Sequence, residues 1–264
     1  MPTAYSILPD RFEDGRHEAI KAGLRRAGYT VIQGHGVPRD ERDVLVTWTV
    51  HRGAKEDAAR AFEAAGGRVI VCEEAYFRIV GGEKCFALAL HDHNGAGRWR
   101  IGGPERWAGF GIALRPWRAP GRHIVVREQR GIGSSVMASP PMWHDQVIAE
   151  IRKRTDRPAV LRFHPKSRMY RNEAAAQPGL MDQLEGAHAM VTWASADAVA
   201  ALAAGVPVFY RAPHWICEGA ARHCLDDIET PFRADRLPAF ERLAWAQWRR
   251  GEIETGEAFK WLLG

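Results

Sequence analysis

The chain has 264 residues, of which 46% are hydrophobic, and a formal net charge of +5. This length suits one large domain or two domains of about 120 residues each, with enough apolar residues for a buried core. No apolar run approaches the roughly 18 residues that span a membrane. The N-terminus lacks the charged-then-apolar order of a signal peptide. We therefore expect a soluble, cytoplasmic protein with no membrane partner.

The first half of the chain predicts alternating helices and strands. Helix-forming residues at 12–27 end at Gly28, and predicted strands follow at 29–33 and 43–48. An Ala-rich helix at 54–65 and a strand at 68–72 complete the pattern, which is typical of parallel βαβ units. Residues 81–118 show little periodicity beyond the apolar run 86–90, so we expect them to be mostly loop.

A similar pattern returns after a linker that contains Pro116, Pro120 and Gly121. The predicted strands are 123–128, 159–163, 189–193 and 206–210, and the predicted helices are 142–154, about 179–186, 196–204 and 236–249. The expected fold class is α/β, with two Rossmann-like domains that face each other across a cleft. The predicted boundaries are 1–119 for the first domain and 120–264 for the second, which includes the terminal helix.

Polar residues follow the predicted strands of the second domain, where ligands bind in an open α/β sheet. The sequence Arg162-Phe163-His164-Pro165 ends one strand, and Ser195 opens the helix after another. Amides of the glycine loop at 129–135 can approach a phosphate. An ordinary glycine turn explains this loop equally well, and Ser195 is equally a helix cap. The pattern indicates a site for a phosphate-bearing ligand.

These motifs resemble those of GT-B glycosyltransferases over residues 123–230. The His-Pro pair is similar to that of capsule-polymer transferases and polysialyltransferases, and the chain also resembles phage-encoded, DNA-modifying glycosyltransferases. The resemblance implies a UDP- or CMP-linked nucleotide sugar as co-substrate and no other cofactor. It also implies no metal ion, which agrees with the lack of a DxD motif in the sequence.

The resemblance further implies residue roles in the second domain. His164 is expected to be catalytic and to stabilise or protonate the leaving phosphate, a role that suits a near-neutral pKa. The alternative is a histidine that only caps a strand. The expected donor-binding residues are Arg130, Gly131, Gly133, Ser134, Arg162, His164, Trp193, Ser195 and Glu218.

An inverting transferase also needs a base in the first domain to deprotonate the acceptor hydroxyl. His93, or its neighbour Asp92, is the first choice, because the pair follows an apolar run and precedes a glycine-rich loop. Glu73 and Glu74 are the second choice. His91, Asp92 and His93 together also fit a weak metal motif, or a solvated turn.

The acceptor prediction rests on the basic and aromatic run at 98–130. Arginines for phosphates and tryptophans for stacking on extruded bases are typical of nucleic-acid grooves. We therefore expect DNA as partner and a hydroxymethylated pyrimidine of phage DNA as the favoured acceptor, which would place the protein in a host cytoplasm. The expected acceptor-binding residues are Arg98, Trp99, Arg100, Arg106 and Trp107.

Several alternatives stay open at this point. The tryptophans of that run can belong to the core, with the arginines solvated or bound to donor phosphate. The protein can instead be a cell-surface polysaccharide transferase, a non-catalytic DNA-binding protein or a nucleotide-sugar epimerase. Cys217 and Cys224, with His214 and His223 nearby, match no common zinc spacing, so reduced thiols are the expected state.

Overall fold

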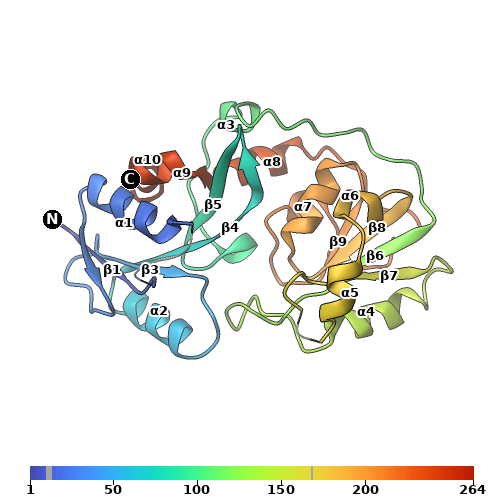
Figure 1. The fold of residues 1–264 in the computed structure, drawn as a ribbon, viewed down its shortest axis with the longest axis horizontal. Helices are drawn as coiled ribbons and strands as arrows, with labels where there is room; N and C mark the ends of the chain where they lie inside the picture. Colours follow the sequence, from blue (N-terminus) through green and yellow to red (C-terminus); the bar gives the residue numbers. More distant parts are fainter. Residues whose placement is uncertain (10–13, 168) are drawn as a thin grey trace. The chain divides into compact units, whose positions relative to one another are not determined.

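The computed structural model describes residues 1–9, 14–167 and 169–264. The chain forms two compact units, which we call unit 1 and unit 2 (Figure 1). Unit 1 comprises Met1–Gly111, Gly133–Ser135 and Glu241–Gly264, and unit 2 comprises Ile112–Ile132 and Val136–Phe240. Within the described residues, no helix combines the length and the apolar character needed to cross a membrane.

Unit 1 is built on a six-stranded sheet, counted over the described ranges, in the order β10-β5-β4-β3-β1-β2. Strands β2, β1, β3 and β4 are parallel to one another. Strand β5 runs antiparallel to β4, and β10 runs antiparallel to β5. The strands are β1 (Thr3–Ser6), β2 (Thr30–Gln33), β3 (Val44–Trp48), β4 (Arg68–Val80), β5 (Glu83–Leu90) and β10 (Gln247–Arg249). The helices with residues in this unit are α1 (Arg16–Arg26), α2 (Ala54–Ala64), η1 (Asn94–Ala96), α3 (Glu105–Ala108), part of α8 (Leu237–Ala244), α9 (Arg250–Glu254) and α10 (Glu257–Leu263).

Helices cover both faces of this sheet. Successive residues of a strand point to opposite faces, so one strand contributes to the core on each side. Val44, Val46 and Ile70 belong to one core cluster with residues of α1, α9 and α10. Leu45 and Val69 belong to another cluster with residues of α2. Strands buried on both faces need a continuous apolar sequence, which is the pattern that predicted them.

The packing of α1 against α9 depends on Gly23. A Cβ atom at this position would overlap the carbonyl oxygen of Ile253 and press on the ring of Phe259. Gly23 therefore sets how closely the C-terminal helices approach α1.

Unit 2 contains four described strands, all parallel, in the order β7-β6-β8-β9. The strands are β6 (His123–Arg127), β7 (Ala159–Arg162), β8 (Ala187–Thr192) and β9 (Val208–Tyr210). Helix α4 contacts β6 and β7, and α7 contacts β8 and β9. The helices with residues in this unit are α4 (Trp143–Ile151), α5 (Arg171–Ala176), α6 (Leu180–Gln183), α7 (Ala196–Ala203), η2 (Glu218–Ala220) and the first half of α8.

The parallel strands of the two units have the same order. In each unit the first strand in sequence lies between the second and the third, so the chain reverses direction across the sheet beside β1 in unit 1 and beside β6 in unit 2. Ligands of open α/β sheets bind outside the carboxyl ends of the strands at such a reversal. The α/β class with a parallel sheet in each half is confirmed, whereas the facing arrangement across a cleft stays a prediction.

Several sequence predictions differ from the structure in part. Most of residues 81–118 lie outside helices and strands, as predicted, but the apolar run at 86–90 belongs to β5, which pairs with β4 through a tight turn at Gly81 and Gly82, both with positive φ. The helix predicted at 236–249 ends at Ala244, and residues 247–249 form β10. The predicted boundary at 120 also differs, because β10 adds to the sheet of unit 1 and α9 and α10 pack on α1. Residues 12 and 13 of the first predicted helix lie outside the described residues, and α1 begins at Arg16.

Candidate functional site

A buried charge network ties together the carboxyl ends of the unit 2 strands. Arg127 ends β6, Arg162 ends β7, and Asp197 lies in the first turn of α7. The Asp197 carboxylate accepts a hydrogen bond from Arg127 Nε at 2.6 Å, and Arg162 Nε lies 3.4 Å away. Arg162 also donates to the Gln183 side chain and to the carbonyl of Pro178. Arg162, predicted to bind donor, is thus held by protein groups.

Glu128, directly after β6, holds the His-Pro loop that follows β7. Its carboxylate accepts the backbone N–H of His164 at 2.7 Å and the hydroxyl of Ser167 at 2.8 Å. Glu128 is 6% exposed, and hydrogen bonds to a buried charged acceptor are among the stronger ones in proteins. The position of His164 is therefore set by Glu128 as well as by Pro165.

The imidazole of His164 is a neutral hydrogen-bond donor. Its Nδ1 accepts the backbone N–H of Lys166 at 2.9 Å, so the ring proton of the neutral form is on Nε2. Burial, together with the positive charges of Arg127 and Arg130, lowers the pKa of His164 to about 4. The expectation of a near-neutral pKa is therefore wrong for the unliganded protein, because burial of the ring and the nearby cations both disfavour its charged form.

A cavity of about 430 Å³ lies beside this loop, within unit 2. Arg130 and Lys166 contribute positive charge to its wall, and Glu128 contributes a negative charge. Both cations are exposed. The remaining lining residues are Ile132, Ser167 and Met169. The volume falls in the range of about 300–1,000 Å³ that is common for small-molecule sites.

The glycine loop is divided between the two units. Gly131, in unit 2, has a positive φ of 67° and donates its N–H to Ser139 Oγ. The carbonyl of Gly133, in unit 1, accepts a hydrogen bond from the backbone N–H of Arg52 in the same unit. Ser134 is fully buried beside Asp92 and hydrogen-bonds its carboxylate. Gly133 and Ser134 are thus buried in unit 1 and are not among the residues that line the 430 Å³ cavity.

Ser195 is the N-cap of α7. Its hydroxyl accepts the backbone N–H of Asp197 at 3.1 Å. Trp193 donates its indole N–H to the carbonyl of Met137 and packs against the core, so its predicted donor contact has a structural alternative. Glu218 lies at the start of η2 and is exposed.

In unit 1, Asp92 and His93 form a hydrogen-bonded pair. His93 Nδ1 lies 2.8 Å from Asp92 Oδ1, so it donates its proton there and leaves Nε2 as the basic nitrogen. Burial lowers the pKa of His93, but the charges of Glu73 and Asp92 outweigh it and the pKa is raised. The arrangement fits a base that is oriented by a carboxylate.

Asp92 itself does not fit the role of base. It is 1% exposed and binds Arg60 at 2.8 Å in addition to His93. Burial opposes its ionisation, but hydrogen bonds from His93 and Ser134 outweigh burial and lower its pKa to about 2. A buried carboxylate of such low basicity can orient a base but is a poor proton acceptor, so His93 is the better of the two choices.

The second-choice carboxylates also have partners. Glu73 accepts the hydroxyl of Thr49 at 2.7 Å and lines a small cavity with His93. Glu74 pairs with Arg16 at 2.5 Å. Glu73 therefore belongs to the surroundings of His93, whereas Glu74 serves an ion pair.

The basic and aromatic run at 98–107 is mostly part of the fold. Arg106 binds Glu252 and the carbonyls of Ala244 and Gln247, and its guanidinium lies 3.8 Å from the centre of the Trp248 ring. Trp107 is 6% exposed. These contacts do not support Arg106 and Trp107 as parts of a nucleic-acid groove, because both side chains are used for packing.

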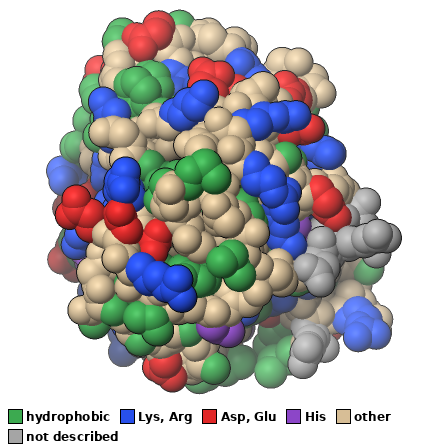
Figure 2. Space-filling view, turned by 90° about the vertical axis from the view of Figure 1, so that its left-hand side faces the viewer, with side chains coloured by type: hydrophobic (Ala, Val, Ile, Leu, Met, Phe, Trp, Pro, Cys, Tyr) green, Lys and Arg blue, Asp and Glu red, His purple; other side chains and the backbone are tan. Residues whose placement is uncertain are grey.

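The other members of that run differ in exposure. Trp99 donates its indole N–H to the carbonyl of Arg242 and is half-buried. Arg98 and Arg100 are exposed. Figure 2 shows one face of the molecule, on which Lys and Arg side chains are interspersed with Asp and Glu. The net positive charge is thus not gathered into one stripe on that face.

In the described part of the chain, no three His, Cys, Asp or Glu side chains are grouped so that they could hold a metal ion. The cysteines are free thiols there. Cys217 is buried and Cys224 is exposed.

No protein-family model matches the chain, and no curated protein matches it in sequence. Among solved structures, it resembles two from Thermosulfurimonas dismutans KpsC. The beta Kdo 2,7 transferase has a TM-score of 0.61 and 14% identity, over 97% of this chain and 99% of that one. The beta Kdo 2,4 transferase has a TM-score of 0.59 and 13% identity, over 94% and 92%. At such identity the likeness shows the fold, which is one that glycosyltransferases use. Both structures are Kdo transferases, and neither is a DNA-modifying enzyme.

Two residues of the unit 2 site were not found from the sequence. Glu128 is the residue after a predicted strand, at the edge where ligand-binding residues are expected, and this position was the available signal. Asp197 is two residues after the helix cap Ser195, where an acidic residue also favours a helix start. Their roles depend on partners 35 to 70 residues away.

Proposed function

We propose that the protein is a glycosyltransferase that moves a sugar from a nucleotide-sugar donor to a hydroxyl of a saccharide acceptor. The observation that carries the proposal is His164, a neutral imidazole whose Nε2–H is available beside Arg130 at the carboxyl edge of a parallel sheet. The fold shared with Kdo transferases supports it. A saccharide acceptor replaces the DNA base, because Trp99, Arg106 and Trp107 of the predicted DNA groove are held by contacts within the fold.

The donor phosphate is assigned to unit 2. In the proposed complex, His164 donates Nε2–H to a phosphate oxygen, Arg130 and Lys166 supply positive charge, and the positive end of the α7 dipole adds to that charge. Such groups are already in place before reaction. They therefore stabilise the charge that develops on the leaving phosphate more than they stabilise the bound donor.

The acceptor is assigned to His93. The acceptor oxygen forms a bond to the anomeric carbon while the bond from that carbon to the phosphate oxygen breaks. The hydroxyl proton goes to His93 Nε2, and the nucleotide leaves with the bonding electron pair. Asp92 stabilises the imidazolium that results. The proposed reaction needs no cofactor besides the co-substrate.

We infer that the donor is CMP- or UDP-linked and that the acceptor belongs to a cell-surface polysaccharide. A sugar acid such as Kdo is the first candidate for the transferred group, because both similar structures are named as Kdo transferases. An excess of cations over carboxylates at the cavity wall favours an anionic donor.

The test is binding and transfer with matched variants. We expect one of CMP-Kdo, UDP-sugars or GDP-sugars to raise the melting temperature of the wild type, since a ligand at 100 times its Kd adds about 2.7 kcal/mol. His164→Ala should lose transfer and most donor affinity with its fold intact by circular dichroism. An exposed control, Lys153→Gln, should retain both. Full turnover by His164→Ala, or no shift with any donor, would contradict the proposal.

A further inference from the structure

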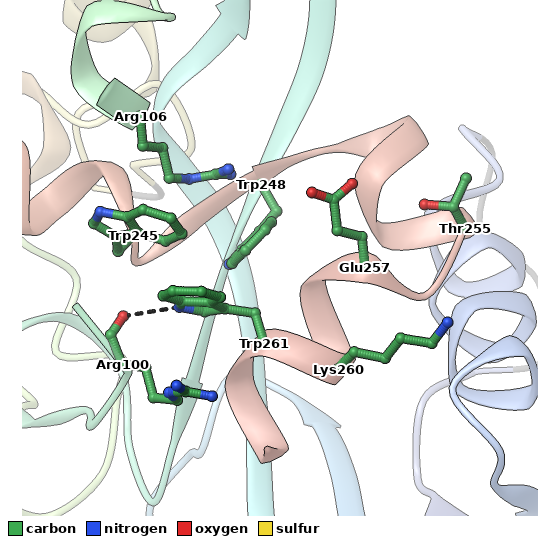
Figure 3. A pocket seen from close by; sticks show the side chains of 8 residues that line it. All are labelled: Arg100, Arg106, Trp245, Trp248, Thr255, Glu257, Lys260 and Trp261. Carbon is green, nitrogen blue, oxygen red and sulfur yellow. Dashed lines mark hydrogen bonds between the residues drawn. The ribbon is translucent and has the colours of Figure 1, made fainter. Parts of the chain in front are cut away.

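A cavity of about 710 Å³ lies in unit 1 and shares no residue with the donor cavity. It is formed where α10 and the turn before it meet β10 and the loop at 100–106 (Figure 3). Figure 3 shows Trp245, Trp248 and Trp261 close together, with the side chains of Glu257, Lys260 and Thr255 to their right. The volume suits a small ligand or a short oligomer.

Aromatic rings form one wall of this cavity. The rings of Trp245 and Trp261 are stacked with their centres 4.3 Å apart. Trp248 stands edge-on to Trp245, with the ring centres 6.1 Å apart. The indole N–H of Trp248, a residue only 2% exposed, has no hydrogen-bond acceptor among the described residues. The indole rings of Trp245 and Trp261 thus offer apolar surface at the wall of the cavity.

Cations surround that wall. The guanidinium of Arg100 lies 4.7 Å from the centre of the Trp261 ring, and Lys260 is exposed one residue away on α10. Neither side chain forms an ion pair within the described residues. Arg106 is fixed by Glu252 and presents a rigid third cation. Glu257 is the one acidic residue among those that line the cavity in the described chain.

We propose that this cavity binds an acidic saccharide at a site separate from the catalytic residues. Indole rings offer apolar surface to the C–H groups of a sugar, and Arg100 and Lys260 pair with its carboxylates. The choice of a saccharide as the ligand, in place of a planar aromatic anion, rests on the proposed function. Such a site would hold a growing polysaccharide away from its reactive end.

The experiment measures affinity of the full chain by calorimetry for oligogalacturonate, which carries carboxylates, and for maltotetraose, which is neutral. We expect the wild type to bind oligogalacturonate and to bind maltotetraose much more weakly. The double variant Arg100→Gln/Lys260→Gln should lose about tenfold or more in affinity, since a charge-assisted contact contributes about a factor of ten.

The control variant Arg25→Gln/Lys153→Gln makes the same change in net charge at exposed positions outside the cavity. It should bind like the wild type. Equal binding by both saccharides, no binding by the wild type, or unchanged binding by the Arg100→Gln/Lys260→Gln variant would overturn the proposal.

Donor binding by the same proteins separates this proposal from the proposed function. A melting shift with a nucleotide sugar that is equal in the wild type and in Arg100→Gln/Lys260→Gln shows that the donor site is intact. Saccharide binding without any nucleotide-sugar shift would overturn the proposed function and leave this site standing. CMP alone is included as a probe, and its loss of binding in Arg100→Gln/Lys260→Gln would overturn the assignment to a saccharide.

Discussion

The environment of His164 makes the stability of the protein depend on pH in a predictable direction. The pKa of the folded imidazole is about 4, whereas an ordinary histidine has 6.5. Below pH 6.5 the unfolded chain takes up a proton that the folded protein refuses. The contribution of His164 to the free energy of unfolding is therefore complete above pH 6.5 and is lost as the pH falls toward 4.

The magnitude follows from the size of that difference. The full shift corresponds to about 3 kcal/mol, and partial exposure of the ring reduces the expectation to about 1–2 kcal/mol. The assay is urea unfolding of the wild type and His164→Asn at several pH values between 4.5 and 7.5. Asparagine keeps an acceptor for the Lys166 N–H. The substitution therefore removes the titrating imidazole and preserves this hydrogen bond of the loop.

Other histidines whose pKa is lowered, such as His17 and His188, titrate in both proteins and cancel in the comparison. The wild type should lose about 1–2 kcal/mol more than His164→Asn over this range. Parallel pH curves would refute the assigned environment of His164. A bound donor phosphate should raise this pKa, so donor binding near pH 5.5 should take up protons in the wild type and not in the variant.

Three further predictions concern other parts of the structure. Glu128→Gln places an amide N–H against the N–H of His164 or the hydroxyl of Ser167, which are themselves hydrogen-bond donors. Affinity for the nucleotide sugar should therefore fall about tenfold or more, measured by calorimetry against the exposed control Glu185→Gln. Equal affinities would contradict the role of Glu128. His93→Gln should retain donor binding and lose transfer by at least about 100-fold, and normal turnover would remove His93 as the base. Gly23→Ala should cost about 2–3 kcal/mol in urea unfolding, whereas Gly219→Ala, with open space around it, should be nearly neutral; equal stabilities would show that α1 and α9 are not in close contact.

The parallel strands could be predicted from the sequence because their signal is local. Strands such as 44–48 and 187–192 are mostly apolar, and each is followed or preceded by a segment of helical composition. Strand β10 gives no such signal. Residues 247–249 become a strand because β5, more than 150 residues earlier, offers an unpaired edge. Pairing at that distance leaves no trace in a local pattern.

The residues of the candidate site also fall into those that the sequence could indicate and those that it could not. His164 and Ser195 could be found from the sequence because both stand at the end of a predicted strand, where ligand-binding residues are expected. Glu128 and Asp197 could not, because their function is to hold other residues of the edge in place. The burial of Ser134 was also out of reach, since it depends on a contact with Asp92, 42 residues earlier.

The excess of arginine has an internal use, which makes it weak evidence for a DNA acceptor. Arg106 donates to the carbonyl of Ala244, Arg118 to those of Ala204 and Leu184, and Arg236 to those of Leu202 and Arg115. Guanidinium groups suit this task because they offer several donors in a fixed plane and stay charged when buried. These arginines satisfy carbonyls of loops and helix ends, so they raise the net charge without offering it to a polyanion. Cations on the walls of the two cavities, such as Lys166 and Lys260, are exposed instead. Exposure and position, more than the number of basic residues, therefore indicate where an anionic ligand binds.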